Sequence, residues 1–163
     1  MVFHWPRPLF YVVLALVLGL DQATKAWVVA SMHSLESITV ISGVFNLTYI
    51  QNQGIAFGMF QGQGLLIALF MIVLAAAAFI YIRGINWAPL EPNLVGGLLV
   101  GGAAGNLLDR CRIGHVVDFF DFHWGMHHWP SFNVADSMIC ISVGWIVLRQ
   151  FRGASSQTTS GAR

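Results

Sequence analysis

Apolar residues gather in four long segments, and the polar residues lie mainly between them. The segments cover about residues 9–30, 65–82, 93–108 and 135–151. Because an α-helix rises about 1.5 Å per residue, a helix of about 20 residues crosses a hydrocarbon core of about 30 Å. The pattern therefore predicts four transmembrane helices. No clean small-residue cleavage site follows the first segment, so we expect an uncleaved helix and not a signal peptide.

Two stretches between these segments, 31–64 and 109–134, differ from ordinary polar loops. The first contains ITVISGVFNLTYI, whose β-branched and aromatic residues predict short strands. The second is interpreted as an aromatic, apolar loop, and it contains Trp124 and Trp129. Tryptophan is favoured at the membrane–water boundary, so this loop is either an interfacial anchor or the wall of a lipid-embedded site.

The composition favours a membrane protein. Of the 163 residues, 56% are hydrophobic and 9% are charged, and the mean hydropathy is +0.69. Soluble domains carry about 25% charged residues. The net charge of +1 argues against nucleic-acid binding. The length fits a single domain, residues 1–152, followed by a polar tail, 153–163, that we expect to be disordered. Cys111 and Cys140 follow no metal or disulfide pattern, so we expect unpaired thiols.

Arginines are distributed unevenly between the two sides of the predicted helices. If the N-terminus is cytoplasmic, most arginines fall on that side. Because cytoplasmic loops are enriched in Lys and Arg, this bias predicts that both termini are cytoplasmic. The inner group is Arg7, Arg83, Arg149, Arg152 and Arg163, and the outer group is Arg110 and Arg112.

Several polar groups lie at membrane depth, where a charged side chain costs about 2.5–3.5 kcal/mol. Asp21 and Lys25 are four residues apart on one helical face, so we expect an ion pair that fixes helix packing. The third segment carries a glycine every four residues, which predicts that another helix backbone approaches it closely. The glycines are Gly97, Gly101 and Gly105, and the outer end of this helix carries Asn106, Asp109 and Arg110, interpreted as a structural support.

Two further aspartates lie in environments that favour opposite protonation states. Asp136 follows Asn133 by three residues at a predicted helix start, which resembles a capping box and favours the ionised carboxylate. Asp118, in VVDFFDF, has apolar neighbours, which favour the neutral acid. One neutral and one ionised carboxyl group can share a water that attacks a peptide carbonyl. The spacing alone leaves Asp109, Asp118 and Asp121 open as the partner of Asp136.

Two other functions fit parts of the sequence. A zinc-dependent membrane hydrolase would use histidine and aspartate ligands. However, HExxH is absent, and the Gly and Pro of WGMHHWP argue against a helical zinc motif. The candidate ligands are His115, His123, His127 and His128, beside Asp118 and Asp121. A small transporter or assembly factor without enzymatic activity is the other alternative, with Asp21 and Lys25 gating ions.

Five short blocks follow one another along the chain. They are DQATK at 21–25, QNQGIAFG at 51–58, GGAAGNLLDR at 101–110, VVDFFDF at 116–122 and FNVADS at 132–137. Each block is weak alone, but all five in this order are highly specific. Together they resemble the lipoprotein signal peptidases (signal peptidase II), which are small bacterial membrane aspartic proteases.

The resemblance implies an all-α membrane protein with four transmembrane helices, a small periplasmic β-rich cradle and an interfacial helix. It also implies an enzyme of the bacterial inner membrane, with its active site near the periplasmic face. Such an enzyme removes the signal peptide from diacylglyceryl-modified prolipoproteins, cutting before the lipidated cysteine. Globomycin-like cyclic peptides are expected inhibitors. We expect no metal, no cofactor and a monomer.

The resemblance also assigns roles to individual residues. It implies that Asp118 and Asp136 form the catalytic dyad, and we hypothesise that Asp136 is ionised while Asp118 carries the proton. The other residues support the dyad or bind substrate. Asp21 and Lys25 are a structural pair, Asn52 and Gly54 lie on a loop near substrate, Asn106, Asp109 and Arg110 form a polar support, and Asn133 and Ala135 flank the second aspartate.

Overall fold

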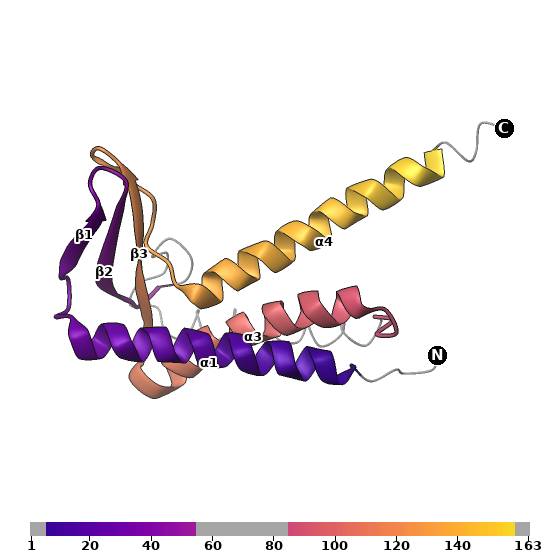
Figure 1. Ribbon diagram of the computed structural model, residues 1–163, viewed down its shortest axis with the longest axis horizontal. Coiled ribbons are helices and arrows are strands. Elements are labelled where there is room, and N and C mark those ends of the chain that lie inside the picture. Colours follow the sequence, from indigo (N-terminus) through magenta and orange to yellow (C-terminus); the bar gives the residue numbers. More distant parts are fainter. Residues whose placement is uncertain (1–5, 55–84, 159–163) are drawn as a thin grey trace.

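The computed structural model describes residues 6–54 and 85–158, which form three helices and one antiparallel sheet. The sheet stands at one end of the helices, and both ends of the described chain, at the start of α1 and the end of α4, lie toward the opposite end (Figure 1). The predicted span at 65–82 lies outside the described residues. The elements are α1 (Pro8–Ser31), β1 (Ser37–Ile41), β2 (Phe45–Asn52), α3 (Leu90–Ile113), β3 (Val116–Trp124), β4 (His127–His128) and α4 (Val134–Thr158).

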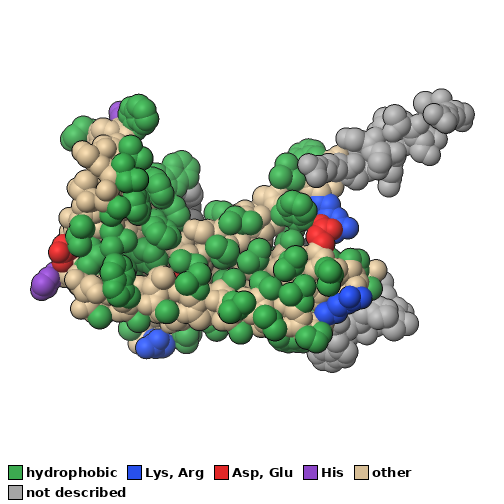
Figure 2. Space-filling view, in the orientation of Figure 1, with side chains coloured by type: hydrophobic (Ala, Val, Ile, Leu, Met, Phe, Trp, Pro, Cys, Tyr) green, Lys and Arg blue, Asp and Glu red, His purple; other side chains and the backbone are tan. Residues whose placement is uncertain are grey.

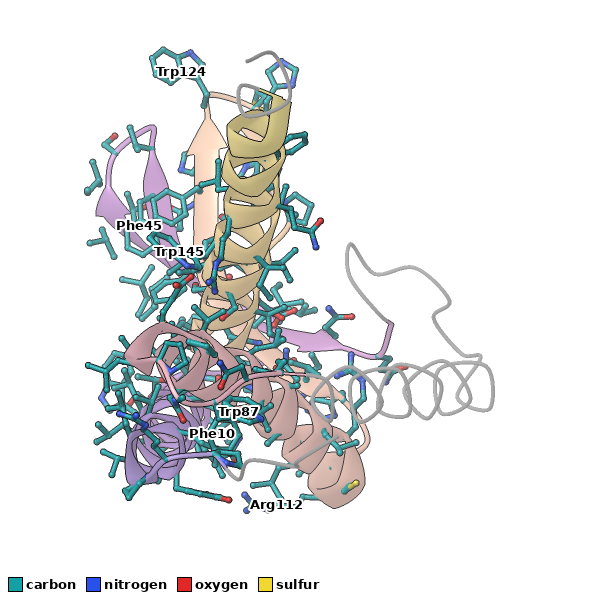
Figure 3. All side chains as sticks on the ribbon, turned by 90° about the vertical axis from the view of Figure 1, so that its right-hand side faces the viewer. Phe10, Phe45, Trp87, Arg112, Trp124 and Trp145 are labelled. Atoms are coloured by element: carbon teal, nitrogen blue, oxygen red, sulfur yellow. The ribbon has the colours of Figure 1, made fainter. Side chains whose placement is uncertain are left out.

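Glycines bring α3 close to its two neighbours. A Cβ atom added at Gly97 would lie 2.8 Å from the carbonyl oxygen of Phe10 on α1. A Cβ atom at Gly102 would lie 2.6 Å from the carbonyl oxygen of Ala135 on α4. The predicted close approach of another backbone is therefore confirmed. At this same end of α1, the ring of Phe10 meets Trp87 edge-on, with 5.3 Å between ring centroids (Figure 3).

The sheet has the strand order β1-β2-β3-β4, and all its strands pair antiparallel. Gly43 and Gly125 form its two turns with φ angles of 77° and 58°, a conformation that glycine adopts without strain. One side of the sheet packs on α1 and on the start of α4. This hydrophobic core consists of Val28, Met32, Tyr49, Val117, Phe119 and Val134.

The predicted all-α fold class is wrong, because a four-stranded sheet is a main part of the described structure. The strands expected within 31–64 form β1 and β2, but the stretch interpreted as an apolar loop contains β3 and β4. VVDFFDF consists largely of β-branched and aromatic residues, which fit a pleated surface. Both faces of this strand are partly buried, so the sequence lacks the polar–apolar alternation that marks a half-buried strand.

The number of membrane-length helices also differs from the prediction. Among the described residues, two helical stretches are long and apolar enough to cross a membrane, Pro8–Ser31 and Val134–Phe151. The predicted span at 93–108 lies within α3, whose glycines and charged ends lower its hydropathy. Helix α4 continues to Thr158, so part of the tail predicted to be disordered is helical. Cys111 and Cys140 are free, as predicted, and both are exposed.

Candidate active site

Asp118 and Asp136 are joined by the residue that precedes α4. Asp118 lies on β3, not on a loop as predicted, and its side chain is 2% exposed. The side-chain amide of Asn133 donates a hydrogen bond to Asp118 Oδ1 at 2.7 Å. The backbone N–H of the same residue donates to Asp136 Oδ2 at 3.2 Å. Two carboxyl groups that are 18 positions apart in sequence are thus held around one asparagine.

The start of α4 orients Asp136. The backbone N–H of Asp136 donates to Asn133 Oδ1 at 3.0 Å, so the two residues exchange hydrogen bonds. This exchange is the predicted capping box, which is therefore confirmed. The other carboxylate oxygen of Asp136 accepts a hydrogen bond from Asn106 Nδ2 on α3 at 2.7 Å. Both oxygens of Asp136 therefore have fixed donors.

The end of β2 fixes the other side of Asp118. Asn52 Nδ2 donates to Asp118 Oδ2 at 2.9 Å, and Asn52 Oδ1 accepts from the backbone N–H of Gly54 at the same distance. The guanidinium of Arg110 on α3 donates to the carbonyl oxygen of Gly54, also at 2.9 Å. The segment 52–54 is thus hydrogen-bonded to the Asp118 carboxyl group through Asn52 and to the Arg110 guanidinium through Gly54.

The protonation of Asp118 follows from its surroundings. Burial raises the pKa of the Asp118 carboxyl to about 7, because the ionised form loses its hydration. The hydrogen bonds from Asn52 and Asn133 oppose this rise, and the negative charge of Asp136 adds to it. Asp118 therefore keeps a proton near neutral pH more readily than an ordinary aspartate.

A buried ion network is connected to the two carboxyl groups through Asn106, which contacts both Lys25 and Asp136. Lys25 Nζ lies 2.9 Å from an oxygen of each of three side chains, Asp21, Asp109 and Asn106. Asp21 Oδ1 also accepts a hydrogen bond from the backbone N–H of Ala135 at 3.0 Å. The predicted Asp21–Lys25 pair is present, and it ties α1 to α3 and to the start of α4. These buried charges are compensated by partners, as charges in a low-dielectric interior must be.

The structure distinguishes the three aspartates that the spacing left open. Asp109 is bound to Lys25, and its Oδ1 accepts from Gln22 Nε2 at 2.9 Å. Asp121 accepts from Asn46 Nδ2 at 3.1 Å and lies 2.8 Å from His128 Nδ1. Within residues 6–54 and 85–158, Asp118 is the one of the three that shares a hydrogen-bonding residue with Asp136.

Gln22 is a site residue that the sequence analysis missed. Its side-chain amide donates to Asp109 Oδ1, to Asp21 Oδ2 at 3.2 Å and to the carbonyl oxygen of Gly105 at 3.3 Å. The available signal was its position between Asp21 and Lys25, because a polar side chain inside an apolar span needs buried partners. Gln22 links the ion network of α1 to the backbone of α3.

The histidines lie in another part of the sheet. The rings of His123 and His128 stack across β3 and β4 with 4.7 Å between centroids. The described part of the chain contains no group of three or more His, Cys, Asp or Glu side chains arranged to hold a metal ion. The zinc alternative therefore gains no support from this geometry.

Two apolar helices of membrane length indicate a membrane protein, and two carboxyl groups that share Asn133 as a hydrogen-bonding residue lie at one end of these helices. The sequence of residues 13–152 matches the family described as signal peptidase (SPase) II, and the chain belongs to this family of membrane peptidases.

Named relatives and solved structures agree with this assignment. The lipoprotein signal peptidase of Syntrophotalea carbinolica is 40% identical, over 84% of this chain and 87% of the relative. That of Geobacter metallireducens is 38% identical, over 92% and 94%. A solved structure described as a bacterial membrane enzyme has a TM-score of 0.82 and 29% identity, over 96% of this chain and 95% of that one.

Proposed function

We propose that this protein is an aspartic endopeptidase that removes the signal peptide from diacylglyceryl-modified prolipoproteins. The cut bond is the peptide bond before the lipidated cysteine. The observation that carries the catalytic assignment is the pair of hydrogen bonds from Asn133 to Asp118 and to Asp136. The substrate class is inferred from family membership and from relatives that are named lipoprotein signal peptidases.

The proposed reaction uses one water and the two carboxyl groups. Asp136, which is ionised, takes a proton from the water as the water oxygen attacks the peptide carbonyl carbon. Asp118, which is neutral, donates its proton to the carbonyl oxygen and so prevents a full negative charge there. The tetrahedral intermediate then collapses and the C–N bond breaks. The leaving nitrogen takes a proton from Asp136, and Asp118 regains its own from the hydroxyl of the intermediate. The products are the carboxylic acid of the signal peptide, which then loses its proton to solvent, and the amine of the lipidated cysteine.

The neighbouring residues are assigned supporting roles. Asn52, Asn106 and Asn133 donate hydrogen bonds that fix the orientation of the two carboxyl groups. The segment at Gly54, held by Arg110, is proposed to contact the substrate peptide. The remaining positioning residues, Asp21, Lys25, Asp109 and Ala135, fix the start of α4 against α1 and α3.

We propose that the protein lies in the bacterial inner membrane as a monomer. Both termini are then in the cytoplasm, and the carboxyl pair lies near the periplasmic face. A diacylglyceryl group resists leaving the bilayer, since each buried CH₂ contributes roughly 0.8 kcal/mol. A site at the membrane boundary lets water reach the peptide bond while the lipid stays in place. Globomycin-like cyclic peptides are expected to inhibit by occupying the dyad.

A cleavage assay on a purified diacylglyceryl-modified prolipoprotein tests the proposal. A general acid or base contributes roughly 10²–10⁴-fold to the reaction rate. Asp118→Asn and Asp136→Asn should therefore each lower the cleavage rate by at least about 10²-fold. Asp121→Asn is the matched control, because Asp121 is also buried on β3 but is bound to Asn46 and His128. A folded Asp118→Asn or Asp136→Asn protein with normal activity would refute the dyad. Loss of wild-type activity in EDTA would favour a metal mechanism instead.

A further inference from the structure

The turn between β3 and β4 exposes an unusual set of side chains. We call residues 122–129, FHWGMHHW, the hairpin tip. Trp124, Met126 and Trp129 are 82%, 92% and 61% exposed. Trp124 lies at the far end of the sheet and points away from the helices (Figure 3). Large apolar side chains gathered at an exposed site indicate an interaction surface.

Helix α1 shows where this surface lies relative to a bilayer. The stretch from Pro8 to Trp27 is about 29 Å long at about 1.5 Å per residue, which is close to the thickness of a hydrocarbon core. Trp27 is exposed at the end of that stretch, and tryptophan is favoured at the membrane–water boundary. The sheet packs on Val28 and Met32, which follow immediately. The sheet therefore begins at the level of the boundary.

The direction of the sheet keeps the hairpin tip near that boundary. The strands extend across the end of α1 and not along its axis (Figure 1). Apolar side chains cover the sheet on the side that faces α4 (Figure 2). The hairpin tip consequently extends sideways from the helices, along the plane that a bilayer surface would occupy.

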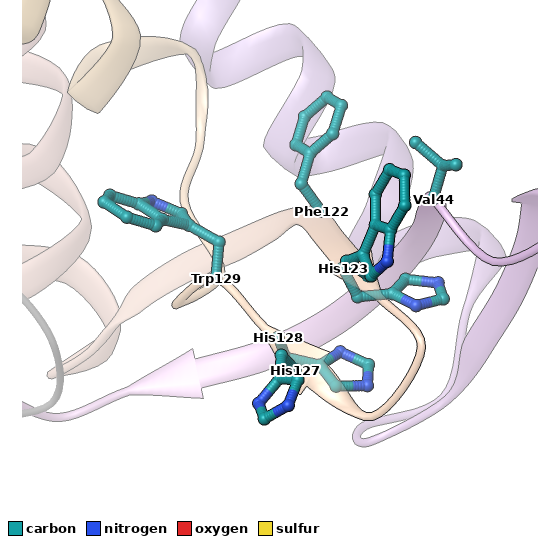
Figure 4. Close-up of a pocket in the computed structure, with 7 residues that line it drawn as sticks. Val44, Phe122, His123, His127, His128 and Trp129 are labelled. Atoms are coloured by element: carbon teal, nitrogen blue, oxygen red, sulfur yellow. The ribbon is translucent and has the colours of Figure 1, made fainter.

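The chemistry of the hairpin tip matches the headgroup and glycerol region of a bilayer. The tip contains no Lys, Arg, Asp or Glu, and the neighbouring carboxylate of Asp121 is buried beside His128. An open hollow of about 350 Å³ lies between its aromatic and imidazole rings (Figure 4). Amphipathic rings of this kind place an apolar body in lipid and a polar edge in water. The lining residues include Val44, Phe122, His123 and Trp129.

We propose that the hairpin tip is a lipid anchor that enters the headgroup region of the leaflet on the sheet side and binds phospholipid. The side chains of Trp124 and Met126 insert beside the acyl chains, and the hollow holds the glycerol region of one lipid. This contact steadies the sheet, and with it Asp118 on β3, at a fixed depth. The anchor extends beyond the proposed peptidase chemistry and does not depend on it.

A fluorescent probe at Met126 tests the anchor. Met126→Cys is made in a Cys111→Ser, Cys140→Ser background, labelled with an environment-sensitive dye and reconstituted in phosphatidylcholine vesicles with brominated acyl chains. His33→Cys in the same background is the matched control, because its side chain is fully exposed outside the hairpin tip. The dye at position 126 should shift to shorter wavelength and lose most of its emission to bromine quenching, while the dye at position 33 should do neither. Equal, weak quenching at both positions overturns the proposal.

Two further measurements keep the result interpretable. If the labelled Met126→Cys protein does not fold, the tryptophan fluorescence of wild type and of Trp124→Phe is compared in the same brominated vesicles. The Trp124→Phe protein should lack a bromine-quenched component that wild type shows. The alternative occupant is a second copy of the chain. Self-quenching of the dye at position 126 that grows with the protein-to-lipid ratio would show tip-to-tip association, and would overturn the lipid assignment. None of these signals requires catalysis, so failure here leaves the proposed peptidase activity separately testable.

Discussion

At the scale of single residues, Asn133 has two separable tasks. Its side-chain oxygen caps α4, and its side-chain nitrogen donates to Asp118. The cap is a common device whose loss costs about 0.5–2 kcal/mol, and serine or aspartate could provide it as well. The amide supplies the cap acceptor and the donor to the buried carboxyl group from two different atoms, whereas a hydroxyl group has a single oxygen for both. Asparagine at position 133 is therefore explained by its hydrogen bond to Asp118, and not by its role as the cap of α4.

A substitution that keeps the cap and removes the donor tests this division. In the proposed mechanism Asp118 must be protonated, so activity should fall as the pH rises through about 7, the pKa of this carboxyl group. The hydrogen bond from Asn133 lowers that pKa. Asn133→Ser should therefore move the alkaline limb of the kcat/KM profile to higher pH, with a stability loss of about 1 kcal/mol. An unchanged alkaline limb in an active Asn133→Ser protein would contradict the assignment of Asp118 as the acid.

The same carboxyl group should make folding stability depend on pH. Its pKa is about 7 in the folded protein and about 3.9 in an unfolded chain. The folded state binds the proton more tightly, so this contribution is complete below about pH 4 and is lost as the pH rises through about 7. Thermal midpoints in detergent should fall over this range for wild type and fall less for Asp118→Asn. Parallel curves for the two proteins would mean that Asp118 titrates normally.

At the scale of elements, the sequence predicted some features well and others poorly. The Asp21–Lys25 pair, the glycine face of α3 and the capping box at Asn133 depend on helical spacing, which short motifs specify. Strand β3 was missed because it is buried against α1 on one side and lined by phenylalanines on the other, and burial of both faces removes the alternation that identifies a strand. Pairing between β2 and β3 is a long-range contact, and local sequence carries little information about such a register.

The packing of α3 against α4 gives a prediction at this scale. A Cβ atom at Gly102 would collide with the backbone of Ala135, which precedes Asp136 directly. Gly102→Ala should push the start of α4 outward, cost about 1–3 kcal/mol and lower kcat. Gly144→Ala on α4 is the matched control, because nothing lies within 4 Å of its added methyl group. That variant should keep its activity and gain up to about 1 kcal/mol from helix propensity. Thermal melting and cleavage rates measure both effects, and equal behaviour of the two variants would refute close packing at Gly102.

At the scale of the whole molecule, the buried charges lie where three helices and the sheet meet. Lys25 on α1, Asp109 on α3 and the N–H of Ala135 on α4 converge on one network. Each of these groups is costly in an apolar interior, so the network is stable only when all its members are in place. The relative position of the helices and the position of Asp136 are therefore set by the same contacts.

The arrangement of the elements also predicts how the chain is oriented. Helix α1 runs toward the sheet and α4 runs away from it, so both ends of the described chain lie opposite the sheet (Figure 1). Arg7 and Arg149 lie at that opposite end, and the arginine bias predicts that this end is cytoplasmic.

A fluorescent protein fused after residue 163 should therefore fluoresce in cells, and alkaline phosphatase fused at the same point should be inactive. Cys111, at the sheet end of α3, should react in intact spheroplasts with a membrane-impermeant maleimide in a Cys140→Ser background. Active phosphatase at the C-terminus together with an unreactive Cys111 would reverse the orientation. The carboxyl pair would then lie on the cytoplasmic side, away from the translocated part of the proposed prolipoprotein substrate.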